Sequence, residues 1–442
     1  MNILYIHTHD SGRMFSPYGY AVPTPNIQNL ADEGYTFRQA FCANPTCSPS
    51  RAAMLTGQYA HSCDLLALTH RGFFMPDHSH HLSNYLASQG YETVLSGVQH
   101  EARIEMLGYE KVLHTEAYHQ EEGFHFTVSD RASARQAADF LRQRTDERPF
   151  FLSVGFVHTN RHYPPADMDI NPNHLRPPEG MPDTNLHRKD MAGLATALCV
   201  VDNCVGEVLE ALKDAGYDKN TLVMFTTDHG IAYPQRKCTL NDGGIGIALI
   251  MRIPGMEKVG KHVDALVSQV DVFPTLCDLA GVTPPAWLEG VSLRPLLEGT
   301  ADSVRDQVFA EVNYHAAYEP IRCVRTERYK YIRYYDETQS TPVPANIDDG
   351  IAKTYVDEQG YLQQKVAREQ LYDLALDPFE RVNLMNDPAM ADVADNLKAM
   401  LQKWQAETKD PLLESNFVPM PAGAKANVIT AYSPKEQDFI YG

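Results

Sequence analysis

A cysteine and an arginine four residues apart, Cys47 and Arg51, stand in the stretch of sequence with the clearest chemical potential. Residues 44–49 are typical of a loop and residues 50–57 are mostly good helix formers, so Cys47 is expected at or just before a helix N-terminus, where backbone N–H groups favour an anion. Arg51 lies one turn further on and is expected to face the same spot. The stretch therefore predicts an anion pocket that contains a sulfur nucleophile. The alternative, an inert buried cysteine beside a structural arginine, is the commoner fate of a single cysteine.

Polar residues replace apolar ones abruptly after two expected strands. Residues 2–6 predict a short apolar strand, and residues 7–13 (His-Thr-His-Asp-Ser-Gly-Arg) follow it. Residues 221–226 predict a second strand, followed by Asp228, His229 and Gly230. Ligand groups in open α/β sheets lie at the carboxyl ends of strands, so both stretches are candidate sites, with polar turns as the structural alternative.

The segment Cys47 to Gly57 has the pattern C-x-P-S-R-x-x-x-L-T-G, which resembles the signature of type I sulfatases in the alkaline phosphatase superfamily. The resemblance extends over most of the chain. It implies that Cys47 is oxidised to formylglycine by a formylglycine-generating enzyme. In that family the hydrated aldehyde attacks the sulfur of a sulfate ester through one hydroxyl, and the other hydroxyl expels the product.

The same resemblance implies a divalent cation. Sulfatases carry two adjacent aspartates after the first strand; Asp10 matches the second of them, and His9 stands in place of the first. Asp228 and His229 match the second metal half-site, which usually reads D-N-G or D-H-G. Oxygen ligands favour calcium, the ion expected here, whereas imidazole ligands shift the preference toward manganese or another transition ion.

Two further positions match residues that contact the sulfate in the family. Lys237 corresponds to a cationic contact, and His100 corresponds to the histidine of a G-K-x-H pattern. Val98 replaces the lysine of that pattern, so one charged contact is missing or comes from elsewhere. Losing one such contact typically costs a factor of about 10²–10³ in rate.

The sequence does not decide which histidine is functional in the loop after the expected strand at 149–156. Aligned through Arg161, the usual family histidine falls on Asn160, with His158 and His162 on either side. We expect His158 to be the functional one and Asn160 to contact substrate. His70 and Arg71, in an irregular segment rich in histidine and aromatic residues, are further substrate-binding candidates, with a solvated loop as the equal alternative.

The composition and length of the chain limit its possible functions. The chain has 442 residues and a formal net charge of -19, which argues against nucleic acid and anionic membrane as partners while leaving a small anionic substrate open. We expect no leader before the first strand and no run apolar enough to span a membrane, which favours a cytoplasmic location. The eight cysteines show neither disulfide spacing nor a paired zinc pattern.

These patterns predict an α/β fold of the alkaline phosphatase type, with a large, mostly parallel sheet flanked by helices and a smaller C-terminal antiparallel sheet with a helix. We expect a catalytic domain at 1–300, an α+β subdomain at 301–414 and an extended tail at 415–442, either a loose tail or an arm on a partner subunit. Residues 403–411 (Lys-Trp-Gln-Ala-Glu-Thr-Lys-Asp-Pro) look closer to heparan N-sulfatases (sulfamidases) than to arylsulfatases.

Three functions remain open from the sequence. The first is a formylglycine sulfatase that acts on a sulfated sugar or small sulfate ester, including an N-sulfate. The second is a phosphonate monoester or phosphodiester hydrolase of the same superfamily, and the third is a non-catalytic binding protein. The intact nucleophile motif argues against the third, and a homo-oligomer is left open.

Overall fold

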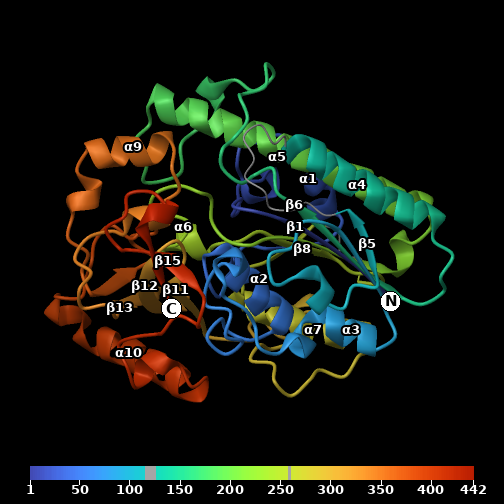
Figure 1. Cartoon of the computed structure of the whole chain (residues 1–442). Coiled ribbons are helices and arrows are strands. Elements are labelled where there is room, and N and C mark those ends of the chain that lie inside the picture. Colours follow the sequence, from blue (N-terminus) through green and yellow to red (C-terminus); the bar gives the residue numbers. More distant parts are fainter. Residues whose placement is uncertain (115–125, 257–259) are drawn as a thin grey trace.

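The computed structural model describes residues 1–114, 126–256 and 260–442. Its centre is an eight-stranded sheet in the order β5-β4-β6-β1-β7-β8-β2-β9 (Figure 1). Strands β5, β4, β6, β1 and β7 run parallel to one another. Strand β8 is antiparallel to both β7 and β2, and β9 is parallel to β2. The strands are β1 (Asn2–Thr8), β2 (Tyr35–Phe37), β4 (Glu92–Gly97), β5 (Lys111–His114), β6 (Phe150–Phe156), β7 (Thr221–Thr227), β8 (Leu249–Arg252) and β9 (Lys261–Val263).

Helices cover both faces of this sheet. Helices α1 (Pro25–Asp32), α4 (Phe126–Gln143) and α5 (Asn185–Asp214) lie on one face, and α2 (Cys47–Thr56), α3 (Leu82–Ser88) and α7 (Val272–Ala280) lie on the other (Figure 1). Because both faces are covered, the central strands are apolar nearly throughout. In β1, Ile3 packs into the core on the α2 side and Leu4 into the core on the α5 side.

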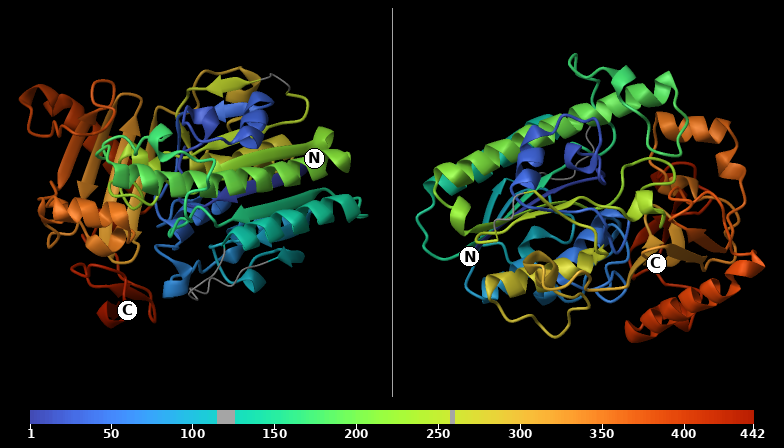
Figure 2. Two further views of the ribbon diagram at one scale, coloured as in Figure 1. Left: turned by 90° about the horizontal axis from the view of Figure 1, so that it is seen from above. Right: turned by 180° about the vertical axis from the view of Figure 1, so that it is seen from behind.

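The C-terminal part forms a separate four-stranded antiparallel sheet, in the order β11-β12-β13-β14. Its strands are β11 (Gln307–Tyr314), β12 (Tyr318–Thr326), β13 (Tyr329–Tyr334) and β14 (Glu369–Asp373), and helix α10 (Ala391–Glu407) packs against it. Figure 2 shows that this unit packs against the carboxyl end of the parallel strands, opposite the end where the chain begins. The expected architecture of a large mixed sheet with a smaller antiparallel sheet and helix is confirmed.

Shorter elements connect the two sheets. Strands β3 (Ala40–Phe41) and β10 (Val267–Ser268) form a parallel pair, and β15 (Lys425–Asn427) and β16 (Phe439–Tyr441) form an antiparallel pair. The remaining helices are α6 (Asp242–Ile245), α8 (Arg294–Glu298) and α9 (Ile351–Glu358).

Residues 415–442 do not extend away from the body. The β15–β16 pair ties the last residues to 425–427, and Val418 and Ala424 pack in a hydrophobic cluster with Leu65 and Phe73. In the single chain, Val418 and Ala424 are buried against the loop that follows α2, whereas Phe417 and Tyr441 remain exposed.

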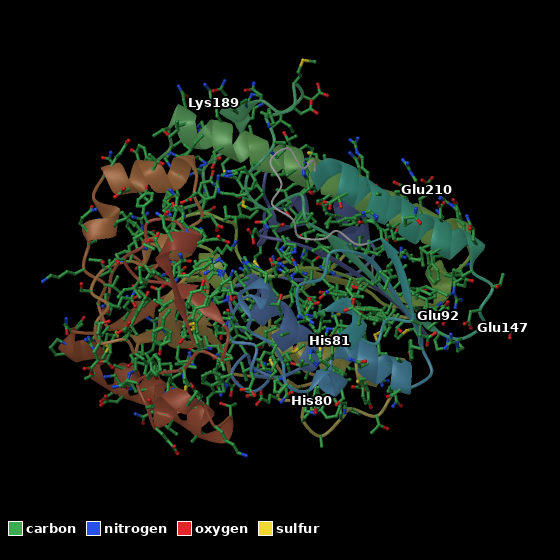
Figure 3. All side chains as sticks on the ribbon, in the orientation of Figure 1. His80, His81, Glu92, Glu147, Lys189 and Glu210 are labelled. Atoms are coloured by element: carbon green, nitrogen blue, oxygen red, sulfur yellow. The ribbon has the colours of Figure 1, made fainter. Side chains whose placement is uncertain are left out.

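Helix α5 corrects the expectation about membrane-spanning runs. By length and composition it could cross a membrane, with a mean hydropathy of 1.5 over 18 residues, of which 61% are buried. Its apolar side packs against α4 and α1, and its opposite side carries exposed Lys189 and Glu210 near its two ends (Figure 3). The pattern is that of an amphipathic core helix, so the burial explains the hydropathy.

A buried ion pair fixes α10 and the following turn to the C-terminal sheet. Arg322, in β12, donates to both carboxylate oxygens of Asp410 at 2.7 and 2.9 Å, and both side chains are fully buried. Burial alone would raise the pKa of Asp410, but Arg322 outweighs it and lowers that pKa to about 2.

We predict that Asp410→Asn lowers the free energy of unfolding by about 3 kcal/mol, because it leaves part of the Arg322 charge buried without its partner. The matched control is Asp264→Asn, which breaks an exposed pair with Arg38 and should cost less than about 1 kcal/mol. Since the Asp410 pKa is lowered, its contribution is present above the unfolded pKa of about 3.9 and is lost as pH falls through about 2. Urea unfolding at pH 7 measures the two losses of stability, and unfolding at pH 3 should show a smaller loss for Asp410→Asn than at pH 7. Equal losses for the two variants at pH 7 would contradict the role of the buried pair.

Candidate active site

Four neighbouring parallel strands bring most of the predicted residues to one edge. The strands β4, β6, β1 and β7 are adjacent in that order, and their carboxyl ends point to the same side of the sheet. The residues that follow them are His100 after β4, His158 after β6, His9 and Asp10 after β1, and Asp228 and His229 after β7. All six side chains are buried. The topology thus gathers residues that are more than 200 positions apart in the sequence.

Helix α2 brings the cysteine to this edge. Cys47 is its first residue and Thr46 its N-cap, which confirms the predicted helix N-terminus. All ten residues of α2 are buried, and Gly57 ends the helix in a left-handed conformation with φ of 67°. The hydroxyl of Ser50 donates to the backbone carbonyl of Asp228 at 2.5 Å, so the serine of the C-x-P-S-R pattern ties the helix to the β7 loop.

Arg51 makes a set of contacts with the two central strands. Its Nη2 donates to the carbonyl of Thr8 at 3.0 Å and to Asp228 Oδ2 at 3.1 Å, and its Nη1 lies 2.5 Å from His7 Nδ1. The guanidinium is fully buried. Arg51 therefore neutralises one of the predicted metal ligands while lying one turn from Cys47.

The loops after β1 and β7 are braced against each other. The backbone N–H of Asp10 donates to Asp228 Oδ1 at 2.9 Å, and the N–H of Gly12 donates to the carbonyl of His229 at 2.8 Å. Asp10 adopts a φ of 43°, a left-handed conformation that aspartate tolerates better than most residues. These bonds fix the two carboxylates relative to each other before any ligand binds.

Gly230 explains the glycine of the Asp-His-Gly motif. A Cβ at this position would lie 2.0 Å from the backbone oxygen of Gly243, so only glycine lets the loop pack against α6. The backbone carbonyl of Gly230 accepts a hydrogen bond from His229 Nδ1 at 2.9 Å.

Two carboxylates, the His9 imidazole and the thiol lie close together, and His229 borders both carboxylates. His229 Nε2 lies 3.3 Å from Asp10 Oδ1 and 3.6 Å from Asp228 Oδ2, and His9 Nδ1 lies 3.4 Å from Asp228 Oδ2. Cys47 Sγ is 3.9 Å from Asp10 Oδ1, and the potential ligand atoms of His9, Asp10, Cys47 and Asp228 all lie within 4.8 Å of one another. This arrangement can hold a divalent cation next to the cysteine.

Lys237 lies on the other side of Asp10. Its Nζ donates to Asp10 Oδ2 at 3.0 Å and to Asp348 at 3.3 Å. Burial disfavours the charge on Lys237, but the carboxylates of Asp10 and Asp348 outweigh it and raise the pKa of the amine well above its usual value. The structure thus places Lys237 at the site, as expected, and its amine stays charged.

Sequence reasoning missed His7 and Asp348, which complete these charge contacts. The sequence places His7 among the polar residues 7–13 after the first strand, but the strand runs on to Thr8 and includes it. The contact of His7 with Arg51 has no local signal in the sequence. Asp348 comes from the C-terminal part, 111 positions after Lys237. An acidic Ile-Asp-Asp-Gly turn at 347–350 was visible in the sequence, but only the fold shows which cation it faces.

The imidazoles of His100 and His158 are both uncharged at neutral pH. Burial and then the charge of Arg51 lower the pKa of His100 to about 3, and burial and then Arg131 lower the pKa of His158 to about 4. The ring of His100 packs edge-on against that of His9, with centroids 5.3 Å apart. An uncharged imidazole can accept a proton from a reacting group.

The two candidate histidines in the loop after β6 differ in their exposure to solvent. His158 is buried and its backbone N–H donates to Asp130 at 2.9 Å, whereas His162 is exposed. Asn160 is half-buried, and its Oδ1 accepts from the N–H of Arg161 at 3.1 Å. The structure places His158, the favoured histidine, at the sheet edge with the other candidates.

The remaining candidates lie further out. His70 is exposed, with its ring 6.2 Å from that of His100, so it lies beside the site. Arg71 is buried and donates to the carbonyl of Ala316 at 3.0 Å and to Asn427 Oδ1 at 2.9 Å. Its described contacts therefore join the β11–β12 turn and the C-terminal segment to the site. Val98, where the family has lysine, is buried.

Comparison with known proteins adds to this geometry. A family model described as Sulfatase matches residues 1–282, and one described as N-sulphoglucosamine sulphohydrolase, C-terminal, matches residues 233–349. The N-sulphoglucosamine sulphohydrolase of Homo sapiens is 30% identical over 468 residues, covering 93% of this chain and 91% of that protein.

Solved structures share the fold. A protein in complex with its substrate D-glucosamine-2-N,6-O-disulfate matches with a TM-score of 0.71 and 19% identity, covering 94% of this chain and 99% of that one. The phosphonate monoester hydrolase of Agrobacterium radiobacter matches with a TM-score of 0.69 and 20% identity over the whole of both chains. The predicted fold of the alkaline phosphatase type is confirmed.

We predict that Arg51→Met lowers the free energy of unfolding by about 3–5 kcal/mol, because Asp228 would remain buried without its arginine partner. Arg38→Met is the matched control: it removes the same group from a pair that is more than half exposed, so the expected loss is below about 1 kcal/mol. Chemical unfolding of both variants without added metal measures the difference. Similar losses would show that Arg51 does not neutralise the carboxylate.

Proposed function

We infer the function of this chain from the premise that it belongs to the sulfatase family, as the family-model match over residues 1–282 and the relative at 30% identity show. The chain is a sulfuric ester hydrolase. We propose the nucleophile, the ion and the substrate from the site at the carboxyl edge of the parallel strands.

We propose that Cys47 is converted to formylglycine and supplies the nucleophile. The observation that carries the proposal is the position of Cys47 at the buried N-terminus of α2, with Sγ 3.9 Å from Asp10 Oδ1. Burial, opposed by Lys237, raises the pKa of the Cys47 thiol, so the encoded side chain is a poor thiolate. A hydrated aldehyde at this position supplies a hydroxyl that attacks sulfur and a second hydroxyl that releases the sulfate.

A divalent cation is proposed for the cluster of Asp10, Asp228, His9 and His229. The cluster fits such an ion, because His229 Nε2 is buried and lies 3.3 Å from Asp10 Oδ1 and 3.6 Å from Asp228 Oδ2. When bound, the ion polarises the sulfate group and lowers the pKa of the attacking hydroxyl. Calcium is the ion that the family resemblance predicts, and manganese is the alternative that imidazole donors favour.

The chain's own residues supply the remaining chemistry. Arg51 and Lys237 place two positive charges at the site, where they attract the sulfate and oppose the negative charge that builds up during attack. His100 and His158 are uncharged at neutral pH, so either can take the proton of the attacking hydroxyl and return one to the leaving nitrogen or oxygen. Water is consumed, and sulfate and the free amine or alcohol are released.

We propose a sulfated sugar as substrate, with N-sulfated glucosamine first. Two observations support an N-sulfate. The relative at 30% identity is an N-sulphoglucosamine sulphohydrolase, and the C-terminal family model of that name covers Lys237 and Asp348 of this site. The structural neighbour that carries D-glucosamine-2-N,6-O-disulfate supports the same class of ligand.

The test is a comparison of kcat/KM on N-sulfated glucosamine, a 6-O-sulfated glucosamine, an aryl sulfate and an aryl phosphonate monoester. We expect the N-sulfated sugar to be the best substrate and the phosphonate to be at least about 100-fold slower than the best sulfate. Cys47→Ala should abolish turnover of all four, because it removes the nucleophile.

Cys42→Ala is the matched control, because Cys42 is a buried core cysteine five residues away and should keep its activity when replaced. A phosphonate turned over faster than every sulfate would favour the phosphonate hydrolase instead. Full activity of Cys47→Ala would overturn the assigned nucleophile.

A further inference from the structure

A hydrogen bond orients the ring of His229. Its Nδ1 lies 2.9 Å from the carbonyl oxygen of Gly230, which can only accept a hydrogen bond, so Nδ1 is the donor. The other ring nitrogen, Nε2, points toward Asp10 Oδ1 at 3.3 Å and Asp228 Oδ2 at 3.6 Å.

These three atoms are buried potential ligands of a metal ion. The nearby cations approach other atoms or other sides: Lys237 Nζ contacts Asp10 Oδ2, and Arg51 contacts Asp228 Oδ2 from the side of β1, where its second nitrogen contacts His7. A cation bound here would have one imidazole nitrogen and two carboxylate oxygens as ligands.

The second imidazole completes the donor set. His9 Nδ1 lies 3.4 Å from Asp228 Oδ2, and His9 is fully buried. Three pairs of these donor atoms lie 3.3–3.6 Å apart, the separation expected of ligands that share a small ion at about 2.1 Å. The carbonyl that accepts from His229 Nδ1 is the kind of outer contact that orients an imidazole ligand toward a metal.

We propose that the resident ion of this site is a divalent transition ion of the manganese or zinc type, held by His9, His229, Asp10 and Asp228, and not calcium. Calcium prefers six to eight oxygen ligands, whereas two imidazole nitrogens and two carboxylates suit zinc, manganese and their neighbours. The inference rests on the proposed function only in placing the ion beside Cys47.

Metal content and thermal stability test this inference without any substrate. Protein stripped with EDTA and dialysed against equal micromolar concentrations of Ca²⁺, Mn²⁺ and Zn²⁺ should retain about one equivalent of Mn²⁺ or Zn²⁺ by mass spectrometry of the metals. Either transition ion should raise Tm at concentrations where Ca²⁺ has no effect. One equivalent of bound calcium, or a Tm increase by Ca²⁺ at the same concentration, would overturn the proposal.

Two variants locate the ion. His229→Asn and His9→Asp each replace an imidazole donor with an oxygen donor, and each should weaken Mn²⁺ or Zn²⁺ binding by at least about 100-fold. The double variant should gain a Tm response to Ca²⁺. His174→Asn, which removes an exposed imidazole outside the site, should leave metal binding unchanged.

The outcomes separate the two proposals. If His229→Asn fails to fold, the wild-type metal content and His9→Asp still decide the matter. Unchanged transition-metal binding in both variants would show that the ion lies elsewhere. A bound transition ion in a protein that cleaves no sulfate would leave this inference intact and reject the proposed substrate.

Discussion

The central constraint on this structure is the burial of two carboxylates, Asp10 and Asp228, at the carboxyl ends of two adjacent strands. A buried carboxylate costs several kcal/mol unless an opposite charge or a set of hydrogen bonds compensates it. Arg51 from α2 compensates Asp228, and Lys237 from the loop after β7 compensates Asp10. The nucleophile helix and the loops are therefore held in place by the same charges that serve the site.

The C-terminal sheet takes part in this compensation. Asp348 contacts Lys237, and Arg71 contacts the Ala316 carbonyl and Asn427. The smaller sheet thus closes one side of the site and does more than cap the fold. Its own attachment also relies on buried charge, through Arg322 and Asp410.

Much of the site could be predicted from the sequence because its residues follow strands in recognisable local patterns. The apolar run at 221–227 followed by Asp-His-Gly, and the loop-to-helix change at Cys47, are both local signals that the structure confirms. The smaller C-terminal antiparallel sheet was also predicted, since the hydrophobic periodicity of its strands is strong.

Other features depend on contacts between distant segments and leave no local trace. The contact of His7 with Arg51 and the partner of Lys237 are set by how distant segments pack. Strand β14, at 369–373, pairs with β13 across a long connection, so its place in the sheet has no local signal. Residues 415–442 were predicted to be extended since they are polar, yet a few apolar residues among them reach the core.

The most direct test of this account is the mass of the tryptic peptide from Gln39 to Arg51, isolated from active protein made in the native host and alkylated after unfolding. This peptide contains both Cys42 and Cys47, so Cys42 is an internal standard for the thiol. The account predicts alkylation at Cys42 alone, with Cys47 present as an aldehyde that has lost its sulfur. Alkylation at both positions in fully active protein would contradict the proposed nucleophile.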